Sequence, residues 1–117
     1  MYIGEVASRT GLTVKAIRFY EAKGLIEVPA RSGRYRIYRE RDIEILLLIK
    51  EAKLLGATLS ELADVIQYRD GNVDWSRILR FLGEIRQRLL ERRLEIDVQL
   101  ARLERCCAEI DRCPDSS

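Results

Sequence analysis

The sequence predicts a mainly α-helical protein with a winged helix-turn-helix head, a small β-hairpin wing and a long dimerisation helix that forms an antiparallel coiled coil. Short apolar segments at helical spacing, broken by glycines, occupy the N-terminal part. A basic stretch with period-two patterning follows, and apolar residues seven positions apart run through the C-terminal third. We therefore expect the winged helix-turn-helix domain at 1–70, a linker at 71–74, the dimerisation helix at 75–110 and a short cysteine-containing segment at 106–117.

The composition indicates a folded chain of about one domain. Of the 117 residues, 47% are hydrophobic and 34% are charged, which supports a modest core and excludes a disordered or collagen-like chain. No apolar run approaches the roughly 20 residues that cross a bilayer, and the N-terminus lacks the pattern of a signal peptide. We therefore expect a cytoplasmic protein without a membrane partner, whose three cysteines are free thiols or metal ligands rather than structural disulfides.

Two short helices are predicted at the N-terminus. The first has apolar residues at helical spacing from Ile3 onward, and Gly11 is expected to end it. Thr13 is expected to cap the second helix, and Gly24 to follow its last turn at the C′ position. Two helices joined by a short segment that contains glycine are typical of a helix-turn-helix.

A β-hairpin with one basic face is predicted from Leu25 to Tyr38, where the pattern changes to period two with turn residues in the middle. Beyond it, Asp42 is expected to cap a third, largely apolar helix that ends at Gly56. Ser60 is expected to cap a short fourth helix. These elements complete the predicted head.

A long helix is predicted after the stretch 68–74, which we interpret as a linker whose last residue, Asp74, caps the helix. Its apolar positions seven apart are Leu82, Leu89, Ile96, Leu103 and Ile110. A helix of about 36 residues is about 50 Å long, which is more than so small a head can cover. The helix could fold back on its own head, but a homodimer explains its length better and presents two heads to a palindromic DNA site. We expect antiparallel pairing, an orientation that periodicity does not fix.

Positive charge is concentrated near the N-terminus. Residues 1–41 hold nine Lys and Arg residues against four Asp and Glu residues, a local charge of +5 in a chain whose net charge is +2. Such a local excess predicts a binding surface for a polyanion, and with a helix-turn-helix the expected partner is double-stranded promoter DNA.

Ten residues of the head are predicted to contact DNA. Thr13, Val14 and Lys15 begin the second helix, where a helix in the major groove reads base edges, and Arg18 and Tyr20 suit phosphate oxygens. The predicted wing contacts are Arg31, Arg34, Tyr35, Arg36 and Tyr38. The alternatives are a solvated helix with Tyr20 packed inside, and a charged run that only keeps the protein soluble.

These motifs together resemble the MerR family of bacterial regulators. The resemblance is carried by Ile3-Gly4-Glu5-Val6-Ala7, Thr10-Gly11-Leu12-Thr13, Ile17-Arg18-Phe19-Tyr20-Glu21, Gly24-Leu25-Ile26, Tyr35-Arg36-Ile37-Tyr38 and Leu55-Gly56-Ala57-Thr58-Leu59. They span residues 1 to about 70 in the family's order, and the long helix follows. The wing departs from the family pattern, because Gly33 is followed directly by Arg34 and the tip is one residue short.

The resemblance implies a winged helix-turn-helix, an antiparallel coiled-coil dimer and a promoter whose spacer between RNA polymerase recognition elements is too long. Members of the family hold that promoter in an unproductive form. Effector binding makes the dimer bend and untwist the DNA, so that polymerase responds to the protein indirectly, through the promoter.

The C-terminal cysteines are predicted to sense an effector. Cys106, Cys107 and Cys113 lie at the end of the long helix and just beyond it. Soft thiolates select Cu(I), Ag(I), Au(I), Zn(II), Cd(II), Hg(II) or Pb(II), and the layout resembles the metal-sensing branch of the family. With no histidine and no cysteine near the start of the helix, a monovalent ion is slightly favoured. The multidrug-sensing branch would need a further domain, and the iron-sulfur branch a four-cysteine pattern.

Other interpretations remain open for the cysteines and for the protein as a whole. The thiols could react with oxidants or electrophiles, or Cys106 could fill a coiled-coil position as a small apolar residue. The chain could also be a coiled-coil adaptor whose degenerate head binds protein. An enzyme is not expected, because the sequence offers neither a histidine base nor a phosphate-binding loop.

Overall fold

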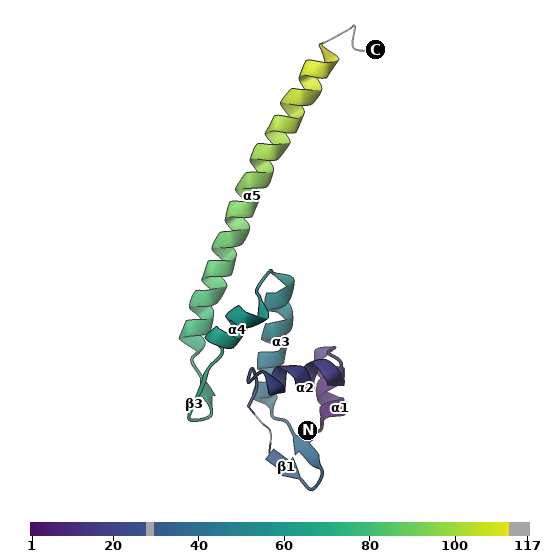
Figure 1. Cartoon of the computed structure of the whole chain (residues 1–117), viewed down its shortest axis with the longest axis vertical. Coiled ribbons are helices and arrows are strands. Elements are labelled where there is room, and N and C mark those ends of the chain that lie inside the picture. The colour runs from purple at the N-terminus through teal and green to yellow at the C-terminus, as the bar shows by residue number, and fades with distance from the viewer. Residues whose placement is uncertain (28–29, 113–117) are drawn as a thin grey trace. The chain divides into compact units, whose positions relative to one another are not determined.

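Figure 1 shows the computed structural model, which describes residues 1–27 and 30–112 apart from the side chain of Arg31. Its elements, in chain order, are α1 (Ile3–Thr10), α2 (Val14–Ala22), β1 (Ala30–Ser32), β2 (Tyr35–Ile37), α3 (Glu40–Leu54), α4 (Leu59–Val65), β3 (Tyr68–Arg69), β4 (Asn72–Val73) and α5 (Trp75–Asp111). The chain divides into two compact units, Met1–Leu82, here called the head, and Gly83–Ser117. The predicted class, a mainly helical protein with a winged helix-turn-helix and a long C-terminal helix, is confirmed.

Helices α1 and α2 begin and end where their capping residues predict. Gly11 adopts a left-handed conformation with φ +72°, and its amide donates to the carbonyl of Ala7 at 2.9 Å. The hydroxyl of Thr13 accepts a hydrogen bond from the amide of Ala16 at 3.0 Å, so Thr13 is the N-cap of α2. Gly24, with φ +78°, follows the last turn.

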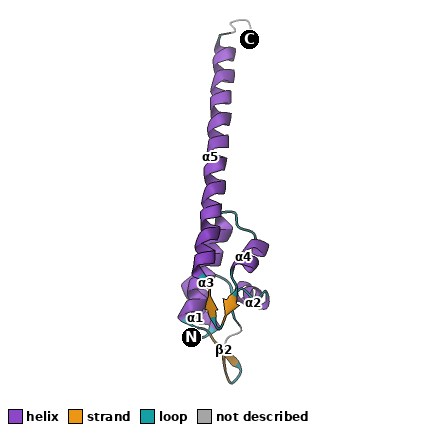
Figure 2. Cartoon of the chain, turned by 90° about the vertical axis from the view of Figure 1, so that its left-hand side faces the viewer, coloured by secondary structure: helices purple, strands orange, loops and turns teal. Residues whose placement is uncertain are grey.

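The hairpin formed by β1 and β2, here called the wing, is the predicted β-hairpin, although its strands lie within 30–37 rather than over the whole of 25–38 (Figure 2). The strands pair antiparallel, with Ala30 opposite Ile37 and Ser32 opposite Tyr35. Gly33 and Arg34 form the two-residue turn between them, and Gly33 has a φ of +63°. The short tip seen in the sequence is therefore a tight turn.

The caps of α3 and α4 differ from the predicted ones. Helix α3 begins after Arg39, and the carboxylate of Asp42 accepts a hydrogen bond from the amide of Arg39 at 2.9 Å. Asp42 is thus the third helical residue of a capping box rather than the cap. Helix α4 is capped by Thr58, whose hydroxyl accepts from the amide of Glu61 at 3.1 Å, and not by Ser60. In both cases an acid three residues after the cap bonds back to it.

The predicted linker is a second hairpin. Strands β3 and β4 pair antiparallel with Tyr68 opposite Val73, and Asp70 and Gly71 turn the chain with φ of 53° and 78°. The segment interpreted as a linker therefore contains regular structure. Asp74 does cap α5 as expected, because its carboxylate accepts from the amide of Ser76 at 3.1 Å.

The core of the head is formed by apolar side chains of α1 to α4 and of the first turns of α5. The residues that are 0% or 1% exposed are Val6, Ile17, Leu25, Ile26, Tyr38, Ile45, Leu46, Ile49, Ala52 and Leu62. From α5, Ile78 and Phe81 are also buried. Burial of these two side chains explains why the head extends to Leu82, beyond the boundary expected near residue 70.

Helix α5 carries the predicted apolar repeat. Beyond the head, Leu89, Ile96, Leu103 and Ile110 are between 36% and 60% exposed in the single chain. The described part of the chain therefore leaves this stripe largely uncovered. None of the described helices combines the length and the apolar composition that a membrane span needs.

Candidate nucleic-acid interface

The N-terminus of α2 presents a solvent-facing surface. Thr13, Lys15 and Arg18 are exposed and Val14 is half-buried, while Ile17 on the other face is fully buried. No acidic residue occupies the first turn, so the positive end of the helix dipole stays uncompensated there. The structure thus brings four of the predicted contacts together on a surface that suits an anionic partner.

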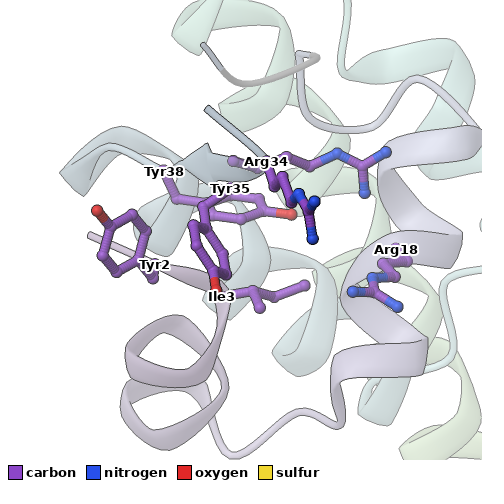
Figure 3. A pocket seen from close by; sticks show the side chains of 7 residues that line it. Tyr2, Ile3, Arg18, Arg34, Tyr35 and Tyr38 are labelled. Atoms are coloured by element: carbon purple, nitrogen blue, oxygen red, sulfur yellow. The ribbon is translucent and has the colours of Figure 1, made fainter. Parts of the chain in front are cut away.

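A second group of predicted residues lines a pocket of about 450 Å³ between α2 and the wing. Figure 3 shows Arg18 approaching from α2 and Arg34 and Tyr35 from the wing. The ring centroids of Tyr35 and Tyr2 are 5.5 Å apart. Arg36 and Tyr38 also line the pocket. Guanidinium groups beside aromatic rings form a site that can hold a phosphate and pack against the adjoining sugar.

Sequence reasoning missed Tyr2 and Ile3, which also line this pocket. Tyr2 directly precedes α1 and is 54% exposed, an unusual position for a large aromatic side chain. An aromatic residue just before the first helix of a basic head was the available signal.

Tyr20 and Tyr38 occupy positions that differ from those expected of phosphate contacts. They are only 6% and 1% exposed. The hydroxyl of Tyr20 accepts from Nζ of Lys53 at 3.4 Å, and the hydroxyl of Tyr38 donates to Glu21 at 3.4 Å. Both tyrosines are therefore part of the core, and the packed Tyr20 considered from the sequence describes its position better.

The environment of Arg36 also differs from that expected of an exposed phosphate contact. Its side chain is 32% exposed, and its Nη1 lies 3.3 Å from the carboxylate of Glu21, whose own side chain is 6% exposed. By contrast, Arg34 is exposed and forms no ion pair with any residue that the structure describes. The side chain of Arg31, the remaining predicted wing contact, lies outside the described part.

Burial governs the protonation of Tyr38. Desolvation, followed by the negative charge of Glu21, raises the pKa of Tyr38 above its ordinary value. The hydroxyl therefore keeps its proton, and the hydrogen bond that it donates to Glu21, to a higher pH than an exposed tyrosine would.

The predicted metal ligands are only partly described. Cys106 and Cys107 are exposed in the last turns of α5, and Cys113 lies outside the described residues. Within residues 1–27 and 30–112, no three Cys, Asp or Glu side chains converge in a way that could hold a metal ion. The arrangement of all three cysteines stays a prediction.

An exposed, basic second helix beside a basic hairpin defines a winged helix-turn-helix module of the kind that binds DNA. Residues 1–69 match the model of the MerR HTH family of regulatory proteins. The HTH-type transcriptional regulator CueR of Salmonella typhi is 34% identical over 120 residues, covering 97% of this chain and 82% of the relative. This chain belongs to the MerR family and is a DNA-binding transcription regulator.

Two further proteins agree along nearly the whole chain. The mercuric resistance operon regulatory protein of Bacillus cereus is 31% identical over 116 residues, covering 97% of this chain and 86% of its own length. The crystal structure of the transcription regulator PbrR691 from Ralstonia metallidurans CH34, in complex with lead(II), superposes with a TM-score of 0.57 at 27% identity. It covers 100% of this chain and 90% of that one.

Proposed function

We propose that this regulator binds a palindromic promoter as a homodimer and switches transcription by distorting the DNA when a thiophilic metal ion binds its C-terminal cysteines. The observation that carries the DNA half is the convergence of Arg18 and Arg34 on one pocket beside the exposed N-terminus of α2. RNA polymerase is affected indirectly, through the promoter, in the cytoplasm.

The DNA contacts divide between the helix and the wing. Thr13, Val14 and Lys15 read base edges from the start of α2. Phosphates are held by Arg18 from the helix and by Arg34 and Tyr35 from the wing, with Arg31 as a further wing cation. The predicted roles of Tyr20, Arg36 and Tyr38 become supporting ones, since the two tyrosines are buried and the guanidinium of Arg36 is paired with Glu21.

Dimerisation through α5 follows from its exposed apolar stripe. Leu89, Ile96 and Leu103 repeat every seven residues and are exposed in the single chain, so a partner helix has to cover them. A twofold dimer places two heads on two half-sites of a palindrome. Bending and untwisting the DNA between the half-sites costs a few kcal/mol, which protein contacts offset.

The effector site is proposed at Cys106, Cys107 and Cys113. Two of these thiols are exposed and adjacent at the end of α5. A relative named for mercuric resistance and a structural neighbour bound to lead(II) support a thiophilic ion. We favour a two- or three-coordinate monovalent ion, with Cu(I), Ag(I) or Au(I) as candidates and Zn(II), Cd(II), Hg(II) or Pb(II) as divalent alternatives.

Two experiments test the proposal. Footprinting of the protein on the promoter region upstream of its own operon should show protection of two half-sites about one helical turn apart. Anaerobic titration of reduced protein with Cu(I), and separately with Zn(II), should give thiolate charge-transfer absorption with a defined stoichiometry per dimer. Full reactivity of all three thiols in the presence of each metal would remove the metal site, and metal-independent oxidation that switches binding would favour a redox sensor.

A further inference from the structure

Glu21 is a buried carboxylate of α2, the proposed recognition helix, and faces the wing. It lies in the last turn of α2, and its side chain is only 6% exposed. A buried carboxylate is costly unless it is paired and hydrogen-bonded. Two groups provide this, Nη1 of Arg36 at 3.3 Å and the hydroxyl of Tyr38 at 3.4 Å, and both act on the same oxygen atom, Oε2.

Both partners of Glu21 come from the C-terminal side of the wing. Arg36 is the central residue of β2, and Tyr38 immediately follows that strand. The backbone of Tyr38 is fixed as well, because its amide donates to the carbonyl of Met1 at 2.7 Å and its carbonyl accepts from the N-terminal amine at 2.9 Å. The base of the wing is thus joined to α2 by side chains and to the start of the chain by backbone.

The charge of Arg36 is therefore used inside the protein. Arg34 and Arg36 both line the pocket that also holds Arg18, but the guanidinium of Arg36 is paired with a buried carboxylate, whereas Arg34 at the tip is exposed and has no ion pair within the described residues. A cation that is already paired releases fewer counterions when a phosphate approaches. The two wing arginines should consequently affect DNA binding in different ways.

We propose that Glu21 is a positioning residue, which fixes the wing against α2 through Arg36 and Tyr38, while Arg34 supplies a phosphate contact of the wing. This inference rests on the proposed DNA contacts of α2 and the wing. It predicts that loss of the Glu21–Arg36 pair lowers affinity for the target sequence, which needs helix and wing in one register. Affinity for unrelated DNA, which depends on the cations that contact phosphates, should change little.

The test is a double-mutant cycle with Glu21→Gln, Arg36→Met and the combined variant, and with Arg34→Met as the matched control. Binding is measured on a duplex selected from a randomised pool by the wild-type protein and on a scrambled duplex of equal length, each over a range of salt. We expect Arg36→Met to weaken binding to the selected duplex by about 3-fold to 30-fold in the wild-type background and little further in the Glu21→Gln background. The slope of log affinity against log salt concentration, here called the salt slope, should stay unchanged for Arg36→Met. Arg34→Met should weaken binding to both duplexes and lower the salt slope by about one.

The opposite outcome overturns the inference. If Arg36→Met lowers the salt slope as Arg34→Met does, with the same cost in both backgrounds, Arg36 is itself a phosphate contact and Glu21 does not act through it. General unfolding of a variant would weaken its binding to both duplexes in parallel. Thermal melting of each variant measures unfolding separately. The combined variant has no buried carboxylate without a partner. It can therefore still be compared with Glu21→Gln if Arg36→Met alone unfolds.

Amide hydrogen exchange provides a readout that needs no DNA. In free Glu21→Gln protein, exchange should accelerate in β1 and β2 while the amides of α2 stay protected. If the wild-type protein selects no duplex from the pool but the wing loosens in this way, the proposed function fails and the positioning role holds. Unchanged protection of the wing contradicts the positioning role whatever the DNA result.

Discussion

The hydroxyl of Tyr68 donates a hydrogen bond of 2.9 Å to the backbone carbonyl of Leu25, 43 residues earlier in the chain. This bond joins the hairpin that precedes α5 to the segment that leads from α2 into the wing. Arg41 strengthens the same junction, because its guanidinium lies 5.8 Å from the ring of Tyr68 and donates to the carboxylate of Glu27. The hairpin that precedes α5 is therefore bound to the segment that connects α2 with the wing.

Replacing Tyr68 with Phe should destabilise the head. The change removes only the hydroxyl and leaves the partly buried carbonyl of Leu25 without this donor, which costs about 1–3 kcal/mol. Urea unfolding measures the difference. Tyr2→Phe is the matched control, because Tyr2 is 54% exposed and no loss is expected there. Equal stability of the Tyr68→Phe protein and the wild type would show that the bond contributes nothing.

The head should also lose stability at alkaline pH through Tyr68. Burial, then the charge of Asp42, raises the pKa of Tyr68 to about 12 from an ordinary value of 10.0. Between these values the unfolded chain releases a proton that the folded chain keeps, so the free energy of unfolding falls as the pH rises, and this loss is absent below pH 10.0.

Urea midpoints at pH about 9 and about 11 measure this decline. Tyr68→Phe should reduce the decline without abolishing it, because the pKa of Tyr38 is raised as well and also contributes. A decline of the same size in Tyr68→Phe as in the wild type would assign the alkaline loss to other groups.

Removal of the Thr13 hydroxyl should weaken the start of the recognition helix. Thr13→Ala deletes the acceptor for the amide of Ala16, with an expected cost of about 1 kcal/mol in stability and weaker binding to the target duplex. Thr13→Ser keeps the oxygen and should restore stability. If Ser behaves like Ala in thermal unfolding, the cap is not what stabilises this end.

The sequence predicted the parts of the fold that one local side chain decides. Gly11, Gly24 and Thr13 act on the adjacent turn only, and each lies where the pattern indicated. Asp42 was misassigned because a capping box places an acid three residues beyond the cap, and Ser60 because Thr58, another residue type that caps helices, stands two residues before it. The Asp70-Gly71 turn was visible in the sequence, but strands of two residues are too short to show a period.

The candidate site followed the same division. Exposed residues such as Lys15, Arg18 and Arg34 could be predicted, because charge at a helix start or a hairpin tip needs no knowledge of packing. The roles of Glu21 and Tyr38 depend on which helix the wing packs against. Residue spacing does not show which helix the wing packs against, so the sequence cannot distinguish a buried tyrosine from an exposed one.

The apolar stripe of α5 should control assembly. Leu103→Glu places a charge in the repeat and should convert the dimer to monomer in analytical ultracentrifugation, with loss of binding to a palindromic duplex. Ala101→Glu is the matched control, because Ala101 is exposed, lies about 200° around the helix from Leu103 and undergoes the same change in charge. Equal sedimentation of both variants as dimers would place the dimer contact elsewhere.

The measurement that tests the account most directly is the salt dependence of promoter binding by the wild type and by Arg18→Ala, with Lys23→Ala as a control of equal charge change at the other end of α2. Arg18 lines the pocket between α2 and the wing, whereas Lys23 lies beyond the helix over the ring of Phe19. We predict that Arg18→Ala weakens specific and non-specific complexes alike and lowers the salt slope by about one, with little change for Lys23→Ala. Equal slopes for Arg18→Ala and the wild type, or no binding of any promoter duplex by the wild-type protein at low salt, would contradict the account.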